Sequence, residues 1–382
     1  VRKRLMRTLA QQKRVKGDAK IPHAIIPLQP PPFTNTIVEG STRELRMKTR
    51  RRLPRLSVND IFEKDLPPDD PRFERYFAMY SSVLGGIVTD PRLMTIPFDD
   101  HMVHRGDGVF ETMAIHHGHV YQMDAHLARL KRSALIAGIK FPLSENEISE
   151  ILLETASVAR SKESIARIFI SRGTGGFSVN PKECRTSHLY VVITDFEKVS
   201  NSFRLNGMRV ITSSIPARKE RSAQLKNCNY MPNALMELEA ANKGVDSAIA
   251  LDENRCLAEG SNKNVAIVTR QNEFITPSFQ NALQGTTLTR ALDIAQKLVE
   301  KGDLLRVKQS EIKPSKAYAA SEMMFLGTTF LVVPIVEYDE HSIGDGKPGA
   351  ITNLLLEYLE RDMQENGDLL TPVPYKEEHS DP

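Results

Sequence analysis

The sequence of 382 residues is 40% hydrophobic and 26% charged, and its net charge is +3. This length allows two domains, each with an apolar core, and no uninterrupted apolar run approaches the ~20 residues that a membrane-spanning helix needs. We therefore expect no membrane association. The three cysteines are too few and too widely spaced for a disulfide framework or a zinc-binding pattern, so we expect a reducing, intracellular compartment.

The basic charge is concentrated in the first part of the chain. Residues 1–55 hold fifteen lysines and arginines against three acidic residues, so the rest of the chain is net acidic. A proline-rich break at Leu28–Pro32 and the lack of a sustained hydrophobic period predict a basic, largely irregular N-terminal extension over residues 1–75.

Two interpretations of this extension are open. Many arginines and few acids are typical of an organelle transit sequence, although such peptides are usually richer in serine. A transit sequence predicts a plastid or mitochondrial location. If the extension is not a transit sequence, we expect a cytoplasmic location. The alternative is a nucleic-acid-binding arm. Because aromatic residues do not alternate with the basic ones, we expect no nucleic-acid partner.

A small α/β domain is expected over residues 76–196. It opens with two predicted strands, Ser82–Thr89 and Leu93–Pro97, which a turn at Asp90 connects. The segment His104–Thr112 has glycines on both sides of its aspartate and predicts a tight turn between strands.

A helix should follow, with Asp124 as its N-terminal cap and apolar residues at three- to five-residue intervals. Arg129 lies beside this apolar stripe, where an arginine is ordinarily a surface salt-bridge partner. The remaining elements of the domain are a helix at Glu145–Arg160 and strands at Ala166–Ser171 and Leu189–Thr194.

The polar stretch 197–207 is the expected linker to a larger domain over residues 208–382. Its predicted strands are Arg209–Ser214, Asp246–Leu251, Leu257–Ala258 and Phe330–Ile335, and its predicted helices start at Pro232, at Gly285 to Thr287 and at Ile351.

Lys226 stands in a short polar loop just before the helix that Pro232 opens and Gly244 ends. A lysine fixed at such a junction can attack a buried carbonyl carbon, whereas most lysines are solvated surface residues. The apolar positions of the helix are Leu235, Met236 and Leu238.

Five motifs favour a catalytic lysine over a solvated surface lysine at position 226. Together they resemble the class IV pyridoxal-phosphate enzymes, which include D-amino-acid aminotransferases, branched-chain aminotransferases and aminodeoxychorismate lyases, and they are closest in wording to plant D-amino-acid aminotransferase-like proteins. The resemblance covers roughly residues 78–355 and implies the two-domain fold of that family, with mixed α/β and α+β structure. The motifs are His104–Thr112, His126–Leu130, Lys226–Tyr230, Ala258–Asn264 and Gly285–Thr287.

The resemblance implies a role for each matching residue. Lys226 would bind pyridoxal 5'-phosphate covalently and then act as general base, and Arg129 would bind the cofactor phosphate, for which a guanidinium is suited. Glu259 would face the pyridine nitrogen, and Tyr230 would donate to the ring oxygen. The start of the later helix would add phosphate ligands. The threonines concerned are Thr286, Thr287 and Thr328.

The reaction is less closely defined by these residues. D-amino-acid aminotransferases usually carry Arg-x-His after an Arg-Gly-Thr loop, and this chain lacks that pattern after Arg172. Gly176 and Phe177 stand there instead, and with Arg172 they are candidates for the substrate pocket. We predict a homodimeric enzyme that transaminates apolar or D-amino acids with 2-oxo acids. The alternatives are aminodeoxychorismate lyase and a non-catalytic cofactor-binding relative.

No metal site is predicted. His101, His104, His116, His117 and His119 are close in sequence, but they have no cysteine or carboxylate partners in register.

Overall fold

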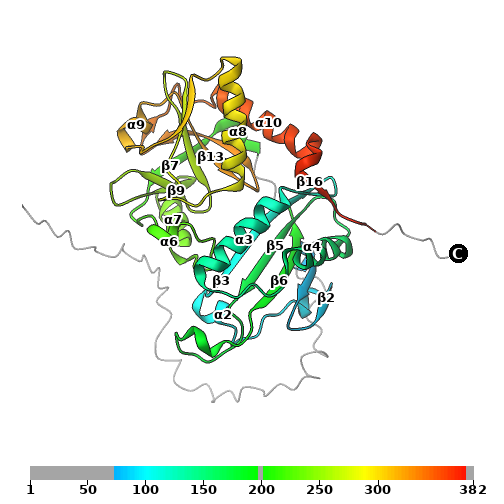
Figure 1. Ribbon diagram of the computed structural model, residues 1–382. Coiled ribbons are helices and arrows are strands. Elements are labelled where there is room, and N and C mark those ends of the chain that lie inside the picture. The colour runs from blue at the N-terminus through cyan, green and yellow to red at the C-terminus, as the bar shows by residue number, and fades with distance from the viewer. Residues whose placement is uncertain (1–72, 197–200, 376–382) are drawn as a thin grey trace, which may run out of the picture. The chain divides into compact units, whose positions relative to one another are not determined.

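The computed structural model describes residues 73–196 and 201–375 (Figure 1). The predicted extension over residues 1–75 therefore lies almost entirely outside the described residues. None of the helices in the described ranges is long and apolar enough to cross a membrane.

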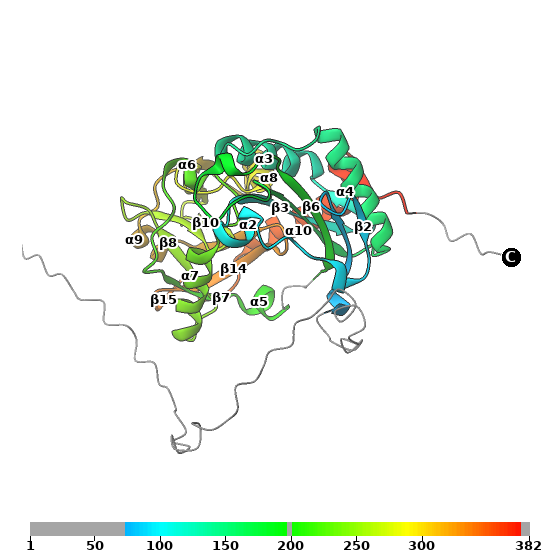
Figure 2. The ribbon, with the colours of Figure 1, turned by 90° about the horizontal axis from the view of Figure 1, so that it is seen from below.

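The described chain contains two separate sheets. Figure 1 shows β3, β5 and β6 in one group and β7 and β13 in the other, and Figure 2 shows β3 and β6 apart from β7 and β14. The first sheet is antiparallel throughout, in the order β16-β4-β3-β5-β6-β1-β2. Its strands are β1 (Tyr76–Ser81), β2 (Gly86–Val88), β3 (Gly108–His116), β4 (His119–Tyr121), β5 (Ser164–Ser171), β6 (His188–Asp195) and β16 (Leu370–Pro372).

Two helices, α3 (Met123–Ala137) and α4 (Glu145–Ala159), cover one face of the first sheet. Alternate residues of a strand point to opposite faces. Val109 and Met113 of β3 therefore pack in the core beneath these helices, whereas Phe110 and Thr112 face the other way, toward a cleft. This alternation makes one face of the sheet structural and the other available to ligands.

The second sheet is mixed and closes on itself. The pairing runs β10-β13-β14-β7-β8-β9, and β9 pairs again with β10 through Glu259 and Asn264. Strands β11, β12 and β15 extend it. Its strands are β7 (Met208–Thr212), β8 (Ser247–Leu251), β9 (Leu257–Gly260), β10 (Asn264–Val268), β11 (Glu273–Thr276), β12 (Arg306–Gln309), β13 (Glu322–Gly327), β14 (Leu331–Tyr338) and β15 (His341–Ser342).

Both faces of this second sheet are buried. In β13, Met324 and Leu326 pack with α8 (Thr286–Lys301) and α10 (Ala350–Glu365), whereas Met323 and Phe325 belong to a different apolar cluster. The shorter helices are η1 (Phe73–Arg75), η2 (Pro91–Leu93), α2 (His101–Arg105), η3 (Pro181–Glu183), α5 (Asn201–Asn206), α6 (Glu220–Ala223), α7 (Met231–Asn242), α9 (Pro314–Tyr318) and η4 (Gly367–Leu369).

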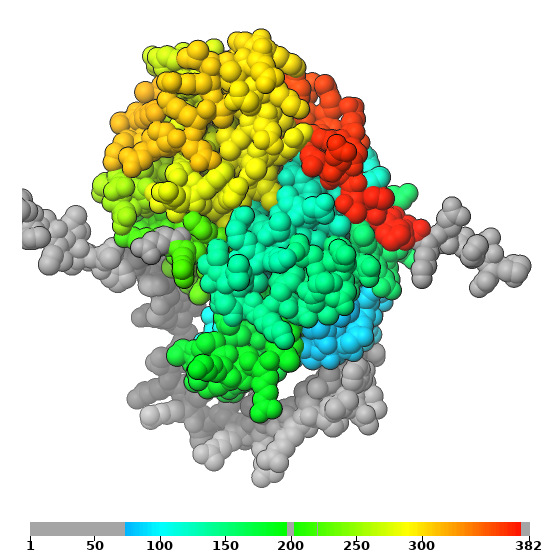
Figure 3. Space-filling view, in the orientation of Figure 1, coloured from blue at the N-terminus to red at the C-terminus, as the bar shows by residue number. Residues whose placement is uncertain are grey.

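The chain returns to the first sheet near its C-terminal end. After α10, strand β16 pairs with β4, and Figure 3 shows this red segment against the surface of the preceding domain. The proposed division into domains over 76–196 and 208–382 therefore needs one amendment, because residues 370–372 pair with the first sheet. Within the proposed linker, α5 forms a short helix.

Most predicted elements are confirmed within a few residues, and five details are wrong. Residues 82–85 of the predicted strand Ser82–Thr89 form the turn between β1 and β2. The segment His104–Thr112 joins helix α2 to strand β3 and is not a turn between two strands. Residues Leu93–Pro97 form no strand, since Asp90 instead caps the short helix η2. Asp124 lies inside the first turn of α3, whose cap residue is Gln122. In α7, Leu235 and Leu238 are 41% and 56% exposed, and only Met236 of the predicted apolar positions is buried.

Candidate active site

Lys226 is held against strand β3 by main-chain contacts. Its carbonyl accepts a hydrogen bond from the Phe110 amide at 3.0 Å, and the Cys228 amide donates to the Gly108 carbonyl at 2.9 Å. The Ser133 hydroxyl of α3 accepts from the Lys226 amide at 3.3 Å. These contacts fix the loop, so that the amine Nζ lies 4.5 Å from the centre of the Phe110 ring.

Lys226 lies where two pockets meet. The smaller pocket lies mainly between the ends of the second-sheet strands, the start of α8 and Arg129. The larger is a cleft of about 970 Å³ between the free face of the first sheet and β13 and β14. Five residues line both of them: Lys226, Tyr230, Asn262, Lys263 and Thr328.

The Lys226 amine has a pKa below that of an ordinary lysine. Burial lowers the pKa of Lys226 to about 8, and the positive charge of Arg129 contributes to the same shift. Neutral and protonated lysine are therefore both substantially populated at neutral to mildly alkaline pH, as a nucleophile and general base requires.

Glu259 lines the smaller pocket at the closure of the second sheet, where β9 pairs with β10. One carboxylate oxygen accepts from Arg218 Nη2 at 3.2 Å, and the other accepts from the Leu283 amide at 3.0 Å. The side chain of Asn264 donates to the Leu283 carbonyl at 2.8 Å. Strands β9 and β10 thus hold both the carboxylate and the loop that leads into α8.

Arg129 belongs to a buried network on α3. Glu111 receives two hydrogen bonds from Arg129, and His126 lies 2.7 Å from the same carboxylate and 3.3 Å from Thr286 Oγ1. Burial alone would raise the pKa of Glu111, but Arg129 and His126 hold it well below its usual range. Burial lowers the pKa of His126. The carboxylate is therefore ionised, and the imidazole is mainly neutral at neutral pH.

The start of α8 lies beside this network. Its cap residue is Gly285, which has no side chain to occupy the first-turn amides, and Arg129 Nη1 donates to the Gln284 carbonyl at 3.1 Å. Thr286, Thr287 and Thr328 line the same pocket. A helix start with threonine hydroxyls and a neighbouring guanidinium forms a site for a phosphate group.

A family model described as amino-transferase class IV matches residues 108–338. The chain belongs to this family. It is 40% identical over 294 residues to the chloroplastic D-amino-acid transaminase of Arabidopsis thaliana, a match that covers 76% of this chain and 78% of the relative.

Further relatives agree in family and in fold. A putative branched-chain-amino-acid aminotransferase of Methanocaldococcus jannaschii is 28% identical, with 72% of this chain and 93% of the relative covered. A solved branched-chain amino acid aminotransferase of Thermobaculum terrenum, in its PLP form, superposes with a TM-score of 0.69 at 20% identity, covering 78% of this chain and 99% of that chain. The class IV aminotransferase fold and PLP-dependent transamination are thereby confirmed, whereas the lyase alternative has no support.

The pocket fits the cofactor of class IV aminotransferases, pyridoxal 5'-phosphate. Its lining has two amines, two guanidinium groups and a helix start. Its one carboxylate, Glu259, accepts hydrogen bonds from Arg218 and a main-chain amide. All seven residues predicted for the cofactor line this pocket: Arg129, Lys226, Tyr230, Glu259, Thr286, Thr287 and Thr328.

The three residues predicted for the substrate pocket line neither cavity. Arg172 pairs with Asp107 and donates to the Ala137 and Gly138 carbonyls at the end of α3, both at 2.9 Å. The Gly176 carbonyl lies 2.9 Å from His101 Nε2. Phe177 is 58% exposed.

The sequence pattern missed Arg218 and Lys263. Arg218 stands eight positions before Lys226 in a segment without a period, and only the fold brings it to Glu259. Lys263 lies inside the Ala258–Asn264 motif at one of its variable positions, and pairs with Glu237 of α7. A signal for Lys263 existed, since a lysine in a turn next to a cofactor carboxylate is a candidate contact.

Proposed function

We propose that this enzyme transfers the amino group of D-amino acids with apolar side chains to 2-oxo acids, with Lys226 as the catalytic base. The observation that carries the proposal is the position of Lys226 at the junction of the two pockets. An amine there would be within reach of a cofactor held in the smaller pocket and of a substrate in the larger one.

When bound, pyridoxal 5'-phosphate supplies an aldehyde that combines with amines and a ring that accepts electrons from the α-carbon. In this chain, Arg129, Thr286, Thr287 and Thr328 would hold its phosphate. Glu259 would balance a protonated ring nitrogen.

Tyr230 would orient the ring through its hydroxyl. Burial raises the pKa of Tyr230 to about 12, so the phenol remains a hydrogen-bond donor at the pH of catalysis. Its ring packs edge-on against Phe110 with the centroids 5.2 Å apart, which limits rotation of the side chain.

Lys226 Nζ would remove the proton from the substrate α-carbon and return it on the cofactor side. This step needs the neutral amine, which the lowered pKa provides. Because the Phe110 ring covers the amine on one side, the proton moves within a site that is partly shielded from water.

The preference for apolar side chains is supported by the walls of the larger cleft. They include Phe110 and Phe169, whose rings stack 5.7 Å apart, together with Phe325, Phe330 and Val333. A cleft with these walls stabilises an apolar side chain by desolvation. The preference for the D configuration is supported by the 40% identity to a D-amino-acid transaminase.

One single-turnover experiment tests both preferences. Holoenzyme is mixed with D-leucine, L-leucine, D-glutamate or L-glutamate in the absence of a 2-oxo acid. We expect D-leucine to remove the visible absorption of the cofactor fastest, and addition of a 2-oxo acid to restore it. A faster reaction with L-leucine would instead support a branched-chain L-aminotransferase, and failure of every donor would reject transamination of these substrates.

We further propose a homodimer, which the family resemblance implies. Phe98 and Phe177 are 74% and 58% exposed although their rings are in contact, and Val179 beside them is 84% exposed. A second copy of the chain would cover this apolar area. Light scattering of wild type and Phe98→Asp tests the idea, because a wild-type monomer would refute it.

A plastid location is also proposed, with residues 1–75 as the transit segment. The basic composition of this segment and the chloroplastic relative support it. A fluorescent protein fused behind residues 1–75 should enter plastids in plant cells, and accumulation in the cytosol would contradict the proposal.

A further inference from the structure

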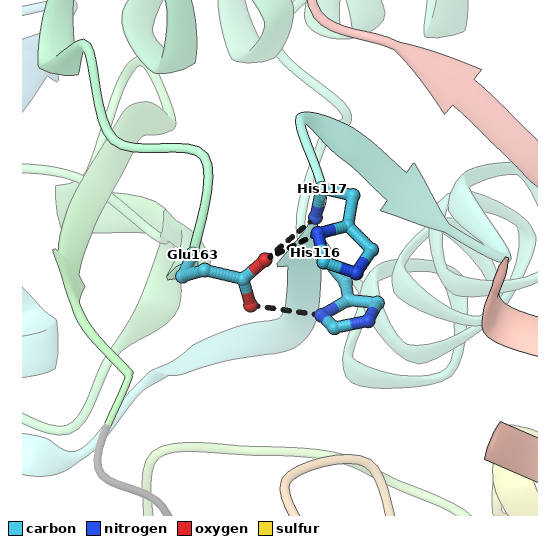
Figure 4. Close-up of side chains that lie close together, drawn as sticks. All are labelled: His116, His117 and Glu163. Carbon is cyan, nitrogen blue, oxygen red and sulfur yellow. Dashed lines mark hydrogen bonds and ion pairs between the residues drawn. The ribbon is translucent and has the colours of Figure 1, made fainter.

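A cluster of potential metal ligands lies away from the active site, at one corner of the first sheet. His116 ends β3, His117 occupies the turn between β3 and β4, and Glu163 precedes β5. Figure 4 shows both imidazole rings directed at the Glu163 carboxylate. In the part of the chain that the structure describes, no other group of three histidine, cysteine or acidic residues is arranged to hold a metal ion.

The two histidines contact different oxygens of one carboxylate. His116 Nδ1 lies 2.8 Å from Glu163 Oε2, and His117 Nδ1 lies 3.2 Å from Glu163 Oε1. All three ligand atoms lie within 4.8 Å of one another, and the two ring centroids are 4.0 Å apart. The cluster therefore converges on one small volume from two segments of the chain.

A tetrahedral ion sets one spacing between its ligand atoms. Ligands that are bound at about 2.0–2.1 Å to a tetrahedral centre lie roughly 3.3 Å from each other. The two imidazole nitrogens and one carboxylate oxygen lie within 4.8 Å of one another, so small side-chain rotations would bring them to this spacing. We propose that His116, His117 and Glu163 form a binding site for a divalent transition-metal ion of the zinc class, with solvent completing the coordination. Imidazole nitrogen and carboxylate oxygen are the ligands that such ions take.

The backbone supports the orientation of these ligands. His117 and Gly118 have φ values of 48° and 76°, so both residues of this two-residue turn are left-handed. Such turns favour Asn-Gly, and histidine is among the non-glycine residues that adopt the left-handed conformation more often than others. The His117 amide also donates to Glu163 Oε1 at 2.8 Å, which fixes the carboxylate from outside the ligand set.

The three ligands are open to solvent. The side chains of His116, Glu163 and His117 are 26%, 40% and 70% exposed, so an ion reaches them directly from solvent.

Metal binding here would connect segments that the chain separates. Glu163 follows His117 by 46 positions, which is why the histidine spacing alone predicted no metal site. A bound ion would link the β3–β4 turn to the segment between α4 and β5, beside the edge where β16 pairs with β4. Since the cluster lines neither of the two active-site pockets, the ion would stabilise the sheet and leave transamination unchanged.

The test uses full-length holoenzyme and Zn²⁺ as the probe. We expect calorimetry to show one equivalent bound, and saturating Zn²⁺ to raise the melting temperature by roughly 3 °C or more. His117→Asn keeps a residue that tolerates the left-handed turn, and Glu163→Gln keeps an acceptor of similar shape. Each should weaken binding by roughly tenfold or more and reduce the thermal shift.

His119→Asn is the matched control. Its ring lies on the same hairpin, but Nδ1 is engaged with the His117 carbonyl at 3.0 Å, so Zn²⁺ affinity should not change. Visible spectra with Co²⁺ should show a band from bound metal in wild type and His119→Asn only. The proposal is overturned if Zn²⁺ does not bind, if it binds His117→Asn and Glu163→Gln as tightly as wild type, or if His119→Asn loses as much affinity as they do.

Discussion

Arg129 and Glu111 form a two-point ion pair in the interior of the protein: Nε lies 2.6 Å from Oε1 and Nη2 lies 2.8 Å from Oε2. Glu111 is fully buried on the core face of β3, and Arg129 is only 5% exposed. The pair orients the guanidinium, and Nη1 then reaches the Gln284 carbonyl before α8. The arginine neutralises a buried carboxylate and also lines the smaller pocket, where we propose that it binds the cofactor phosphate.

Arg129→Ala should lower both cofactor affinity and stability. Loss of the guanidinium removes the proposed phosphate ligand. It also leaves Glu111 buried without its arginine partner, which typically costs about 3–5 kcal/mol of unfolding free energy. Equilibrium dialysis with pyridoxal 5'-phosphate and urea unfolding of the apoenzyme measure the two effects separately.

The double variant Arg129→Ala with Glu111→Gln separates the two functions of Arg129. Because the neutral amide removes the unpaired charge, stability should recover in part, whereas cofactor affinity should remain low. Unchanged cofactor affinity in the single variant would refute the phosphate role.

Lys226→Ala should abolish the visible absorption of the bound cofactor and all turnover. The physical reason is that no other amine in the pocket is positioned by the β3 contacts described for Lys226. Lys263, which lines the same pocket but is paired with Glu237, is the matched control. Lys263→Met should retain the absorption, and an unchanged spectrum in Lys226→Ala would exclude Lys226 as the cofactor lysine.

The pH dependence of cofactor uptake follows from the same lysine. Because only the neutral amine reacts with an aldehyde, the rate at which apoenzyme takes up pyridoxal 5'-phosphate should rise with pH through about 8. The folded-state pKa lies below the ordinary value of 10.5, so the unfolded chain binds more protons between these limits and Lys226 makes apoenzyme stability rise with pH there.

Lys226→Met is the control for the effect on stability. It removes the titrating amine while keeping a similar side-chain length, so this part of the pH dependence of melting should disappear. If cofactor uptake by wild type rises only above about pH 10, where an ordinary lysine loses its proton, the pKa of Lys226 is not lowered.

The sequence was sufficient for local features of this protein. The capping box of α4, with Ser144 and Glu147, and the left-handed Gly302 that ends α8 are short-range signals, and both helices are where the pattern predicted them. Lys226, Glu259 and Arg129 were predicted as site residues because each lies in a contiguous motif. These residues lie together in one pocket, as the resemblance implied.

What could not be predicted depends on contacts between distant segments. The approach of Arg218 to Glu259, the pairing of β16 with β4 and the approach of Glu163 to His117 have no periodic or motif signal. Arg172 shows the converse problem. Its place in the Arg-Gly-Thr loop of the family made it a candidate for the substrate pocket, but its guanidinium contacts the end of α3.

Glu259→Gln should retain the cofactor and slow the half-reaction. An amide cannot balance a protonated ring nitrogen, and electrostatic contributions of this kind are commonly worth ~3 kcal/mol, or roughly a hundredfold in rate. Rapid-mixing spectroscopy with a saturating amino donor measures this rate directly. Turnover at the wild-type rate would mean that Glu259 serves only to hold Arg218 and the Leu283 amide.

Arg172→Ala should affect stability and leave substrate binding unchanged. The guanidinium donates to the Ala137 and Gly138 carbonyls, where a cation also interacts favourably with the helix dipole, and it pairs with Asp107. Loss of such charged hydrogen bonds typically costs about 2 kcal/mol, so the melting temperature should fall while KM for donor and acceptor stays within roughly twofold of wild type. Arg172→Lys keeps the positive charge but loses the planar guanidinium, so its melting temperature should lie between those of wild type and Arg172→Ala. A large rise in KM with an unchanged melting temperature would instead support the substrate-pocket role that was predicted for Arg172 from the sequence.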